Sequence, residues 1–295
     1  MGDDGIDEVT VRALLEEHHP DLAGLEIHGP VRGWDHQLWR LGGELAVRIP
    51  CTPQASDLLR KEYRWLPLLA PGLPLPVPTP LRITEPSALF PRPWNIAAWV
   101  PGEPADRAPV SEGRRSAHAL AGFLAALHQA APRDAPGNPE RGVALDSLTP
   151  SFDRALRGVA SLVPDGVQEV WNDAVAAPAW AGPPVWLHGD LHPANVVVSQ
   201  GALHGVVDFG DLCAGDPATD LVAAWMLLPA PAIPLFLDAY GRADEPMIRR
   251  ARGWTVLRAL GLIAIGRAGE EGLPGGKPTW GPAGRLALDR VLASH

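Results

Sequence analysis

Hydrophobic positions in the first hundred residues follow two different periods. Apolar residues recur about every 3.6 positions over 7–18 and 54–70, which predicts two amphipathic helices. The shorter segments that are typical of strands are 25–28, 37–41, 44–49, 81–84 and 94–100. The pair Gly42-Gly43 separates the second and third of them, as in a tight hairpin, and the prolines of 73–80 require an extended connection. This part therefore predicts an antiparallel sheet of about five strands with two helices.

The pattern changes at Pro101-Gly102-Glu103-Pro104, where we place a boundary between two lobes. The chain beyond it is mostly helical, apart from two β segments around Val196 and Val206 and a Gly/Pro-rich loop at 269–282. The expected helices are 111–130, 151–163, 167–176, 217–228, 231–240, 245–267 and 283–294. We predict an α+β fold with a small antiparallel-sheet lobe over residues 1–100 and a larger, mostly helical lobe over residues 101–295.

Composition narrows the class of protein without naming a function. The 295 residues are 46% hydrophobic and carry a formal net charge of −9, with no basic patch, so we expect no nucleic-acid partner. Cys51 and Cys213 are too few for a disulfide framework, and no signal peptide is visible, which favours a cytoplasmic location. The long uncharged run 221–237 is interrupted by prolines and is too short for a membrane span.

One short string carries most of the chemical information. Residues 188–195 read HGDLHPAN, and Asp208-Phe209-Gly210 follows Asn195 after thirteen positions. This is the spacing of the catalytic loop and the metal-binding Asp-Phe-Gly of kinases. Asp190 would accept a hydrogen bond and then the proton from an acceptor hydroxyl. Asn195 and Asp208 would supply hard oxygen ligands to Mg²⁺, which bridges the phosphates of a nucleotide.

Two other interpretations of the string are weaker. Asp, Asn, Gly and Pro all favour turns, so any one of these residues alone indicates only a cap or a turn. A zinc site from His188, His192, His204 and Cys213 would need the first two on one helical face, which Pro193 disfavours. His188 is better explained as a residue that holds the loop through hydrogen bonds.

With these motifs in place, the segment 186–228 resembles the aminoglycoside phosphotransferase family. It contains the family's HGD-x-x-x-x-N, Val-Asp-Phe and Gly-Asp-Pro-x-x-Asp-Leu elements in order. The resemblance continues upstream through 33–36, 45–50 and 61–67 and covers roughly residues 30 to 230. It implies a two-lobed, protein-kinase-like fold that uses ATP or GTP as the phosphate donor and Mg²⁺ as the cofactor.

The resemblance also implies roles for residues of the first lobe. Arg48 occupies the place of the family's phosphate-clasping lysine, and Glu62 lies on the helix that carries the ion-pair partner of that lysine. Backbone groups of Ala98 and Val100 would bind the purine edge, and the turn Trp34-Asp35-His36 would cover the phosphates. Arginine in place of lysine is a departure from the family, because its planar fork is not a point charge. Solvent-exposed surface positions remain the alternative for Arg48 and Glu62.

Three features of the second lobe stay open on sequence alone. Asp220 would brace the catalytic loop, as the resemblance implies, or act as a charge at a helix N-terminus. His128 lies on an apolar helix and is best explained as a hydrogen-bonded core histidine. The acceptor pocket could hold a cationic molecule on carboxylates or an apolar molecule on tryptophans, and the candidates are Asp153, Asp238, Asp244, Glu245, Glu270, Glu271, Trp171, Trp180, Trp225, Trp254 and Trp280.

We therefore predict a Mg²⁺-dependent kinase that moves the γ-phosphate of ATP or GTP to a hydroxyl of a small molecule, and the expected acceptor is an antibiotic such as an aminoglycoside. The alternatives are a metabolic kinase for a sugar or amino alcohol, a macrolide kinase and, more remotely, a nucleotide-binding pseudokinase. The intact trio Asp190, Asn195 and Asp208 argues against the pseudokinase. The expected partners are a nucleoside triphosphate and a small acceptor, with no membrane.

Overall fold

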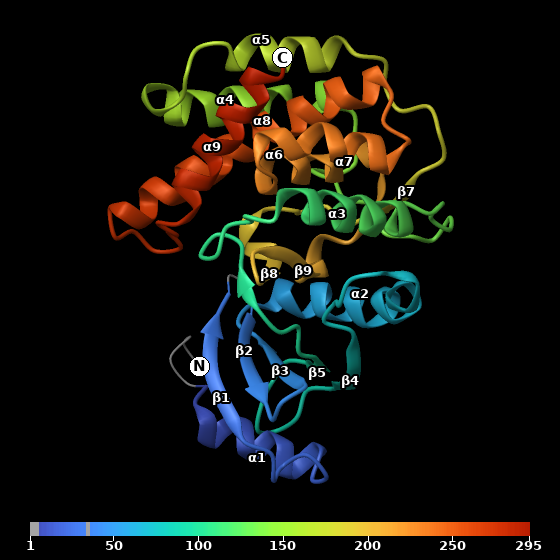
Figure 1. Ribbon diagram of the computed structural model, residues 1–295. Coiled ribbons are helices and arrows are strands. Elements are labelled where there is room, and N and C mark those ends of the chain that lie inside the picture. The colour runs from blue at the N-terminus through green and yellow to red at the C-terminus, as the bar shows by residue number, and fades with distance from the viewer. Residues whose placement is uncertain (1–5, 34–35) are drawn as a thin grey trace. The chain divides into compact units, whose positions relative to one another are not determined.

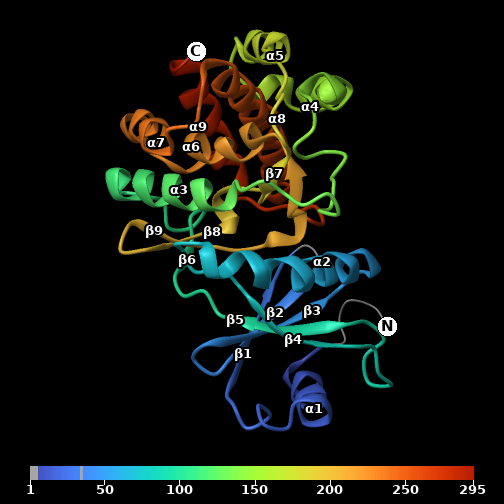
Figure 2. The ribbon, with the colours of Figure 1, turned by 90° about the vertical axis from the view of Figure 1, so that its right-hand side faces the viewer.

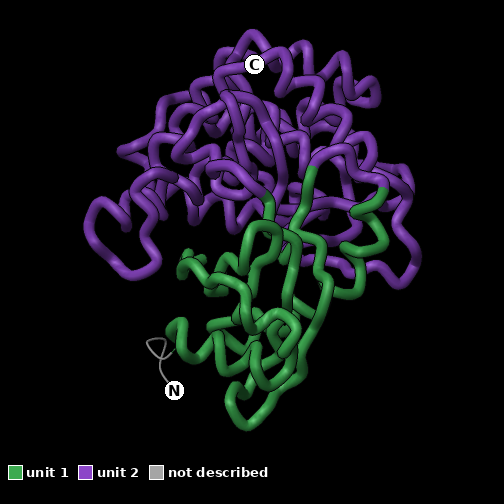
Figure 3. The backbone as a smooth tube through the Cα atoms, turned by 60° about the horizontal axis from the view of Figure 1, so that its bottom comes forward, with its two compact units in different colours: residues 1–71, 76–100, 208–210 green, residues 72–75, 101–207, 211–295 purple. Residues whose placement is uncertain are grey.

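The computed structural model describes residues 6–33 and 36–295. The chain divides into two compact units, and neither is contiguous in sequence (Figure 3). The first comprises residues 1–71, 76–100 and 208–210, and the second comprises 72–75, 101–207 and 211–295. The short segment that begins with Asp208 thus belongs to the same unit as the first hundred residues.

The first unit is built on a five-stranded antiparallel sheet. Its strands, in spatial order, are β1 (Ile27–Arg32), β2 (His36–Leu41), β3 (Leu45–Pro50), β5 (Trp94–Ala98) and β4 (Pro80–Thr84). Gly42 has a φ of +59° in the turn between β2 and β3, where a side chain would be strained, so glycine suits this hairpin. The predicted sheet is confirmed, and its strands lie within about two residues of the predicted segments except for the first, which ends at Arg32 rather than at residue 28.

Helices α1 (Glu8–His18) and α2 (Pro53–Leu69) cover opposite faces of this sheet (Figures 1 and 2). Alternation along β3 explains the division, because successive side chains of a strand point to opposite faces. Val47 and Ile49 join the apolar cluster that α1 closes, whereas Arg48 between them meets α2. The buried charge therefore lies on the face of the sheet that α2 covers, and Figure 1 shows the position of that helix.

The second unit is mostly helical, as predicted. Its helices are α3 (Gly113–Leu127), α4 (Thr149–Val159), α5 (Val167–Ala176), α6 (Ala223–Leu227), α7 (Ile233–Tyr240), α8 (Glu245–Glu270) and α9 (Trp280–Ala293). The long helix α8 packs against α9, α5 and α4 and forms the centre of the unit. The segment 217–228 differs from the single helix that we expected, because a 3₁₀ segment, Pro217–Val222, precedes α6. The α+β class is confirmed.

Two small sheets interrupt these helices and frame the motif. One pairs β7 (Val185–Leu187) with β10 (Cys213–Gly215), and the other joins β6 (Glu103–Pro104), β8 (Val196–Ser199) and β9 (Ala202–Val206). The β segments expected around Val196 and Val206 are thus confirmed, whereas β6, β7 and β10 were not predicted. The catalytic string begins where β7 ends and finishes where β8 begins. Among the described residues, no helix is long and apolar enough to cross a membrane.

Candidate active site

The loop from His188 to Asn195 is held by its own first residues. The imidazole Nδ1 of His188 accepts a hydrogen bond from the Asp190 N–H at 3.2 Å, and Nε2 lies 3.0 Å from the carbonyl oxygen of Val207. Since Nδ1 accepts, the proton of the neutral ring is on Nε2 and is donated to Val207. The predicted role of His188 as a loop anchor is confirmed. Gly189 has a φ of +84°, a conformation that turns the chain sharply before Asp190.

Asp220 stabilises this turn through hydrogen bonds. Its carboxylate accepts the N–H of His188 at 2.7 Å and the N–H of Gly189 at 2.9 Å, and the side chain is fully buried. His128 also contacts it, with Nε2 at 3.3 Å from Oδ2, and Nδ1 of the same ring lies 2.7 Å from the Tyr240 hydroxyl. Of the two roles expected for Asp220, the structure therefore supports bracing of the loop rather than a charge at a helix N-terminus. His128 is the hydrogen-bonded core histidine that we expected.

The two oxygens of Asp190 face different groups. Oδ1 lies 3.5 Å from a guanidinium nitrogen of Arg141 and 3.5 Å from one of Arg258. Oδ2 lies 3.3 Å from Nδ2 of Asn195 and 3.5 Å from Nε2 of His192. The side chain remains 31% exposed, so a molecule from solvent reaches the carboxylate. This geometry suits a group that orients an acceptor hydroxyl.

Electrostatics keep Asp190 ionised. Burial acts to raise the pKa of its carboxyl, but the hydrogen bond and the charge of His192, followed by the charges of Arg258 and Arg141, outweigh burial and hold the pKa well below its ordinary value. A carboxylate of this kind is a weak base. It is better suited to accept a hydrogen bond than to remove a proton early in a reaction.

Asp190 is part of a larger charged group in the second unit. Arg141 also contacts Oδ2 of Asp211 at 3.0 Å, and Nδ2 of Asn138 donates to Oδ1 of Asp211 at 3.1 Å. Arg258 donates to the carbonyl oxygen of Gly189 at 2.8 Å. We call Asp190, Asp211, Arg141 and Arg258 the Asp190 cluster. Positive and negative charges thus alternate along the chain of contacts from Arg258 to Asp190, Arg141 and Asp211.

Asn195 and Asp208 have the chemistry that a magnesium ion requires. The amide nitrogen of Asn195 donates to the backbone and side-chain oxygens of Asp190, at 3.0 and 3.3 Å, so the amide oxygen is the atom left for a cation. Asp208 is exposed and has a φ of +62°, a strained value for a residue with a side chain, and such strain concentrates at functional positions. Amide and carboxylate oxygens are hard ligands, so each of these residues is by itself a suitable type of Mg²⁺ ligand. Among the described residues, no group of three or more His, Cys, Asp or Glu side chains forms a metal cluster, which gives the zinc interpretation no support.

In the first unit, Arg48 and Glu62 form a buried ion pair. Nη1 of Arg48 contacts Oε2 of Glu62, and Nη2 donates to Oε1 at 3.2 Å, so the pairing is bidentate. Burial acts to lower the pKa of Arg48, but the charge of Glu62, its hydrogen bond and the charge of Asp208 outweigh burial and raise the pKa. The surface alternatives for Arg48 and Glu62 are wrong, because both are buried. The fold brings Arg48, Glu62 and Asp208 together from distant parts of the sequence.

The contacts of Ala98 and Val100 with a purine remain predictions. The Ala98 N–H donates to the Thr79 carbonyl at 2.9 Å, so only the carbonyl of Ala98 would be left for a ligand. Val100 is buried where the first unit ends. Of the expected phosphate-covering turn, Trp34 and Asp35 lie outside the described residues.

Sequence reasoning missed Arg141, Arg258 and Asp211. Arg258 did leave a signal, because it is the only charged residue between 253 and 266 in an otherwise apolar stretch of α8. A lone charge in such a stretch must find a buried partner or reach a polar site. Arg141 left no comparable signal, since it lies in a Pro/Gly-rich loop.

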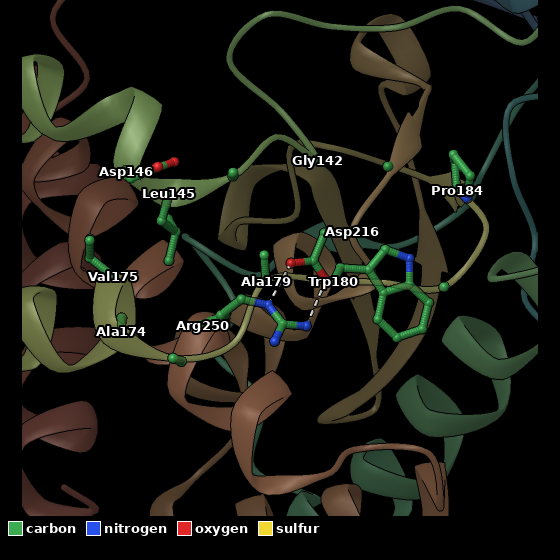
Figure 4. A pocket seen from close by; sticks show the side chains of 14 residues that line it. Gly142, Leu145, Asp146, Ala174, Val175, Ala179, Trp180, Pro184, Asp216 and Arg250 are labelled. Carbon is green, nitrogen blue, oxygen red and sulfur yellow. Dashed lines mark hydrogen bonds and ion pairs between the residues drawn. The ribbon is translucent and has the colours of Figure 1, made fainter.

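A separate hollow of about 280 Å³ lies in the second unit, near the start of β7 (Figure 4). Asp216 and Arg250 meet there in a buried ion pair, with Nε of Arg250 donating to Oδ2 of Asp216 at 2.7 Å, and Leu145 and Trp180 supply apolar walls. Asp216 belongs to the Gly-Asp-Pro element of the motif, and its pairing with Arg250 gives that aspartate a structural role. Trp180, a candidate for an apolar acceptor pocket, is therefore among the lining residues, whereas Asp190, Asn195 and Asp208 are not.

The fold and the site define a phosphotransferase of the kinase-like class, and comparison with known proteins gives the family. A model of the phosphotransferase enzyme family matches residues 26–260, and the chain belongs to this family. No curated protein matches the sequence. The expected family and fold are confirmed.

Solved structures agree on the fold at low sequence identity. The GDP complex of an aminoglycoside 2'-phosphotransferase-IIIa has a TM-score of 0.70 at 19% identity, covering 98% of this chain and 100% of that one. A GDP and kanamycin complex of a related enzyme has a TM-score of 0.66 at 20% identity, with 98% and 100% covered. The macrolide 2'-phosphotransferase of Brachybacterium faecium has a TM-score of 0.61 at 22% identity, with 92% and 97% covered. The chain is therefore similar to enzymes with two different kinds of acceptor.

Proposed function

We propose that the protein transfers the γ-phosphate of ATP or GTP to a hydroxyl group of a small molecule, with Asp190 as the catalytic residue. The observation that carries this proposal is the geometry of Asp190, whose carboxylate is partly exposed, ionised and fixed from both sides. Membership of the phosphotransferase enzyme family supports the reaction type. The solved complexes with GDP support a nucleoside triphosphate donor.

In the proposed reaction, Asp190 accepts a hydrogen bond from the acceptor hydroxyl and orients its oxygen toward the γ-phosphorus. A bond forms between that oxygen and the γ-phosphorus, while the bond to the oxygen that bridges the β- and γ-phosphates breaks. The hydroxyl proton passes to the Asp190 carboxylate and then to solvent. Positioning and charge neutralisation supply most of the catalysis in such a transfer.

The other predicted residues have supporting roles in this proposal. Asn195 and Asp208 would hold Mg²⁺, which neutralises phosphate charge when it is bound. Arg48, fixed by Glu62, would bind phosphate oxygens, and Ala98 and Val100 would contact the purine. Residues 1–100 would therefore serve as the nucleotide-binding lobe, and residues 101–295 would hold the acceptor.

We further propose an antibiotic or a similar natural product as the acceptor. The support is the likeness to structures described as aminoglycoside and macrolide phosphotransferases. A metabolic kinase for a sugar or amino alcohol uses the same chemistry and is the second candidate. The charges around Asp190 bear on this choice and are taken up in the next subsection.

Replacing Asp190 with alanine tests the proposed reaction. We expect the release of nucleoside diphosphate in the presence of Mg²⁺ and acceptor to fall by at least about 10²-fold, because the hydroxyl loses its orienting group and proton acceptor. Nucleotide affinity should stay near wild type, which would show that the variant is folded. The matched control is Asp289→Ala, which removes an exposed carboxylate of α9. Undiminished turnover in Asp190→Ala would rule out the assignment.

A further inference from the structure

The charges beside Asp190 are unusual for a site that would receive a polycationic acceptor. Arg141 and Arg258 each bring a guanidinium nitrogen to within 3.5 Å of Oδ1 of Asp190, and their side chains remain 15% and 20% exposed. Burial lowers the pKa of Arg258 to about 10, so the group still carries its charge at neutral pH. Any molecule that reaches Oδ1 therefore meets two positive charges.

The carboxylates around Asp190 are already paired. Asp211 contacts Arg141 at 3.0 Å and accepts a hydrogen bond from Asn138. Glu140 also lies 3.8 Å from Arg141, although it is largely exposed. An ammonium group on the acceptor needs unpaired carboxylates to replace its water, and like charges placed side by side are unfavourable. In the part of the chain that the structure describes, each carboxylate that contacts the cluster has a guanidinium partner.

Guanidinium groups instead favour oxygen-rich neighbours. Arginine has only hydrogen-bond donors, and these match hydroxyl, carbonyl or carboxylate oxygens. We propose that the acceptor presents oxygen substituents, and no ammonium group, next to the hydroxyl that is phosphorylated, and that Arg258 and Arg141 make this selection. This inference rests on the proposed function and deepens it. It disfavours acceptors in which amino groups flank the hydroxyl, as they do in aminoglycosides.

The test uses kanamycin as a polycationic probe and measures its equilibrium binding to the full-length protein by calorimetry. We expect weak binding to wild type and to Arg258→Lys, which keeps the positive charge. Arg258→Gln should bind kanamycin about tenfold more tightly, because one repelling charge beside Asp190 is gone. Arg267→Gln, which removes a charge from an exposed position of the same helix, should match wild type.

Two results would overturn the inference. One is wild-type protein that binds kanamycin as tightly as Arg258→Gln does, or that transfers phosphate to it. The other is Arg258→Gln with a wild-type melting temperature and no gain in kanamycin affinity. Because the readout is binding rather than turnover, it separates this inference from the proposed phosphotransfer. If the proposed phosphotransfer were wrong, Mg²⁺-dependent nucleotide turnover would instead be absent with every acceptor.

Discussion

At the scale of single residues, two variants separate the structural role of the Arg48–Glu62 pair from its proposed role in nucleotide binding. Arg48→Met leaves the buried Glu62 carboxylate without a partner, and we expect the free energy of unfolding to fall by about 3–5 kcal/mol. The double variant Arg48→Met, Glu62→Leu removes both charges and should regain most of that stability. Urea unfolding measures both effects.

The same double variant tests the proposed role of Arg48 in nucleotide binding. Its affinity for ATP or GTP should fall by at least about tenfold even with stability restored, because a charged donor for phosphate oxygens is missing. Nucleotide affinity that recovers together with stability would limit Arg48 to a structural role. The sequence predicted this pair only through resemblance to a family, because burial of two charged residues is not visible in a local pattern.

At the scale of the elements, the 3₁₀ segment Pro217–Val222 fixes the catalytic loop through Asp220. Asp220→Asn keeps the shape, but its amide group has one acceptor oxygen for the two N–H groups of His188 and Gly189. We expect stability to fall by about 2 kcal/mol, since one buried N–H loses its partner. We also expect faster amide exchange at these residues and lower nucleotide turnover.

The control for this variant is Asp289→Asn on the exposed face of α9, which should change none of these readouts. Wild-type exchange rates at His188 and Gly189 in Asp220→Asn would show that another group fixes the loop.

The elements also show which features local patterns determine. Helices such as α2 and α5 were predicted nearly to the residue, because their apolar spacing and their ends are encoded within the segment. Strands β7 and β10 were missed because three residues are too few to show a period. The catalytic loop was predicted because its residues are close in sequence. Arg258 was missed because α8 brings it to Asp190 from 68 positions away.

For the whole molecule, a hydrophobic content of 46% is enough for a sizeable interior. The structure shows in addition where charged side chains are buried in that interior. Each unit holds its own ion pair, Arg48 with Glu62 in the first and Arg250 with Asp216 in the second. An additional charge that acid pH creates in this interior has no partner there, so it should lower the free energy of unfolding.

His36 is the residue through which acid should act on the first unit. Burial, followed by the nearby charge of Arg48, lowers the pKa of its ring to about 3, against about 6.5 in the unfolded chain. The unfolded state therefore binds the proton more readily. The stability that the neutral ring contributes is complete above the unfolded pKa, and it is lost as pH falls from about 6.5 toward 3.

We expect the free energy of unfolding to drop by about 2 kcal/mol between pH 7.5 and pH 5 through this residue alone. In His36→Asn, which has no group that titrates in this range, the drop should be smaller by that amount. His118→Asn replaces an exposed ring and should keep the full dependence of the wild type. Urea unfolding of the three proteins at both pH values makes the comparison. Equal slopes for His36→Asn and wild type would mean that acid destabilises the chain at another site.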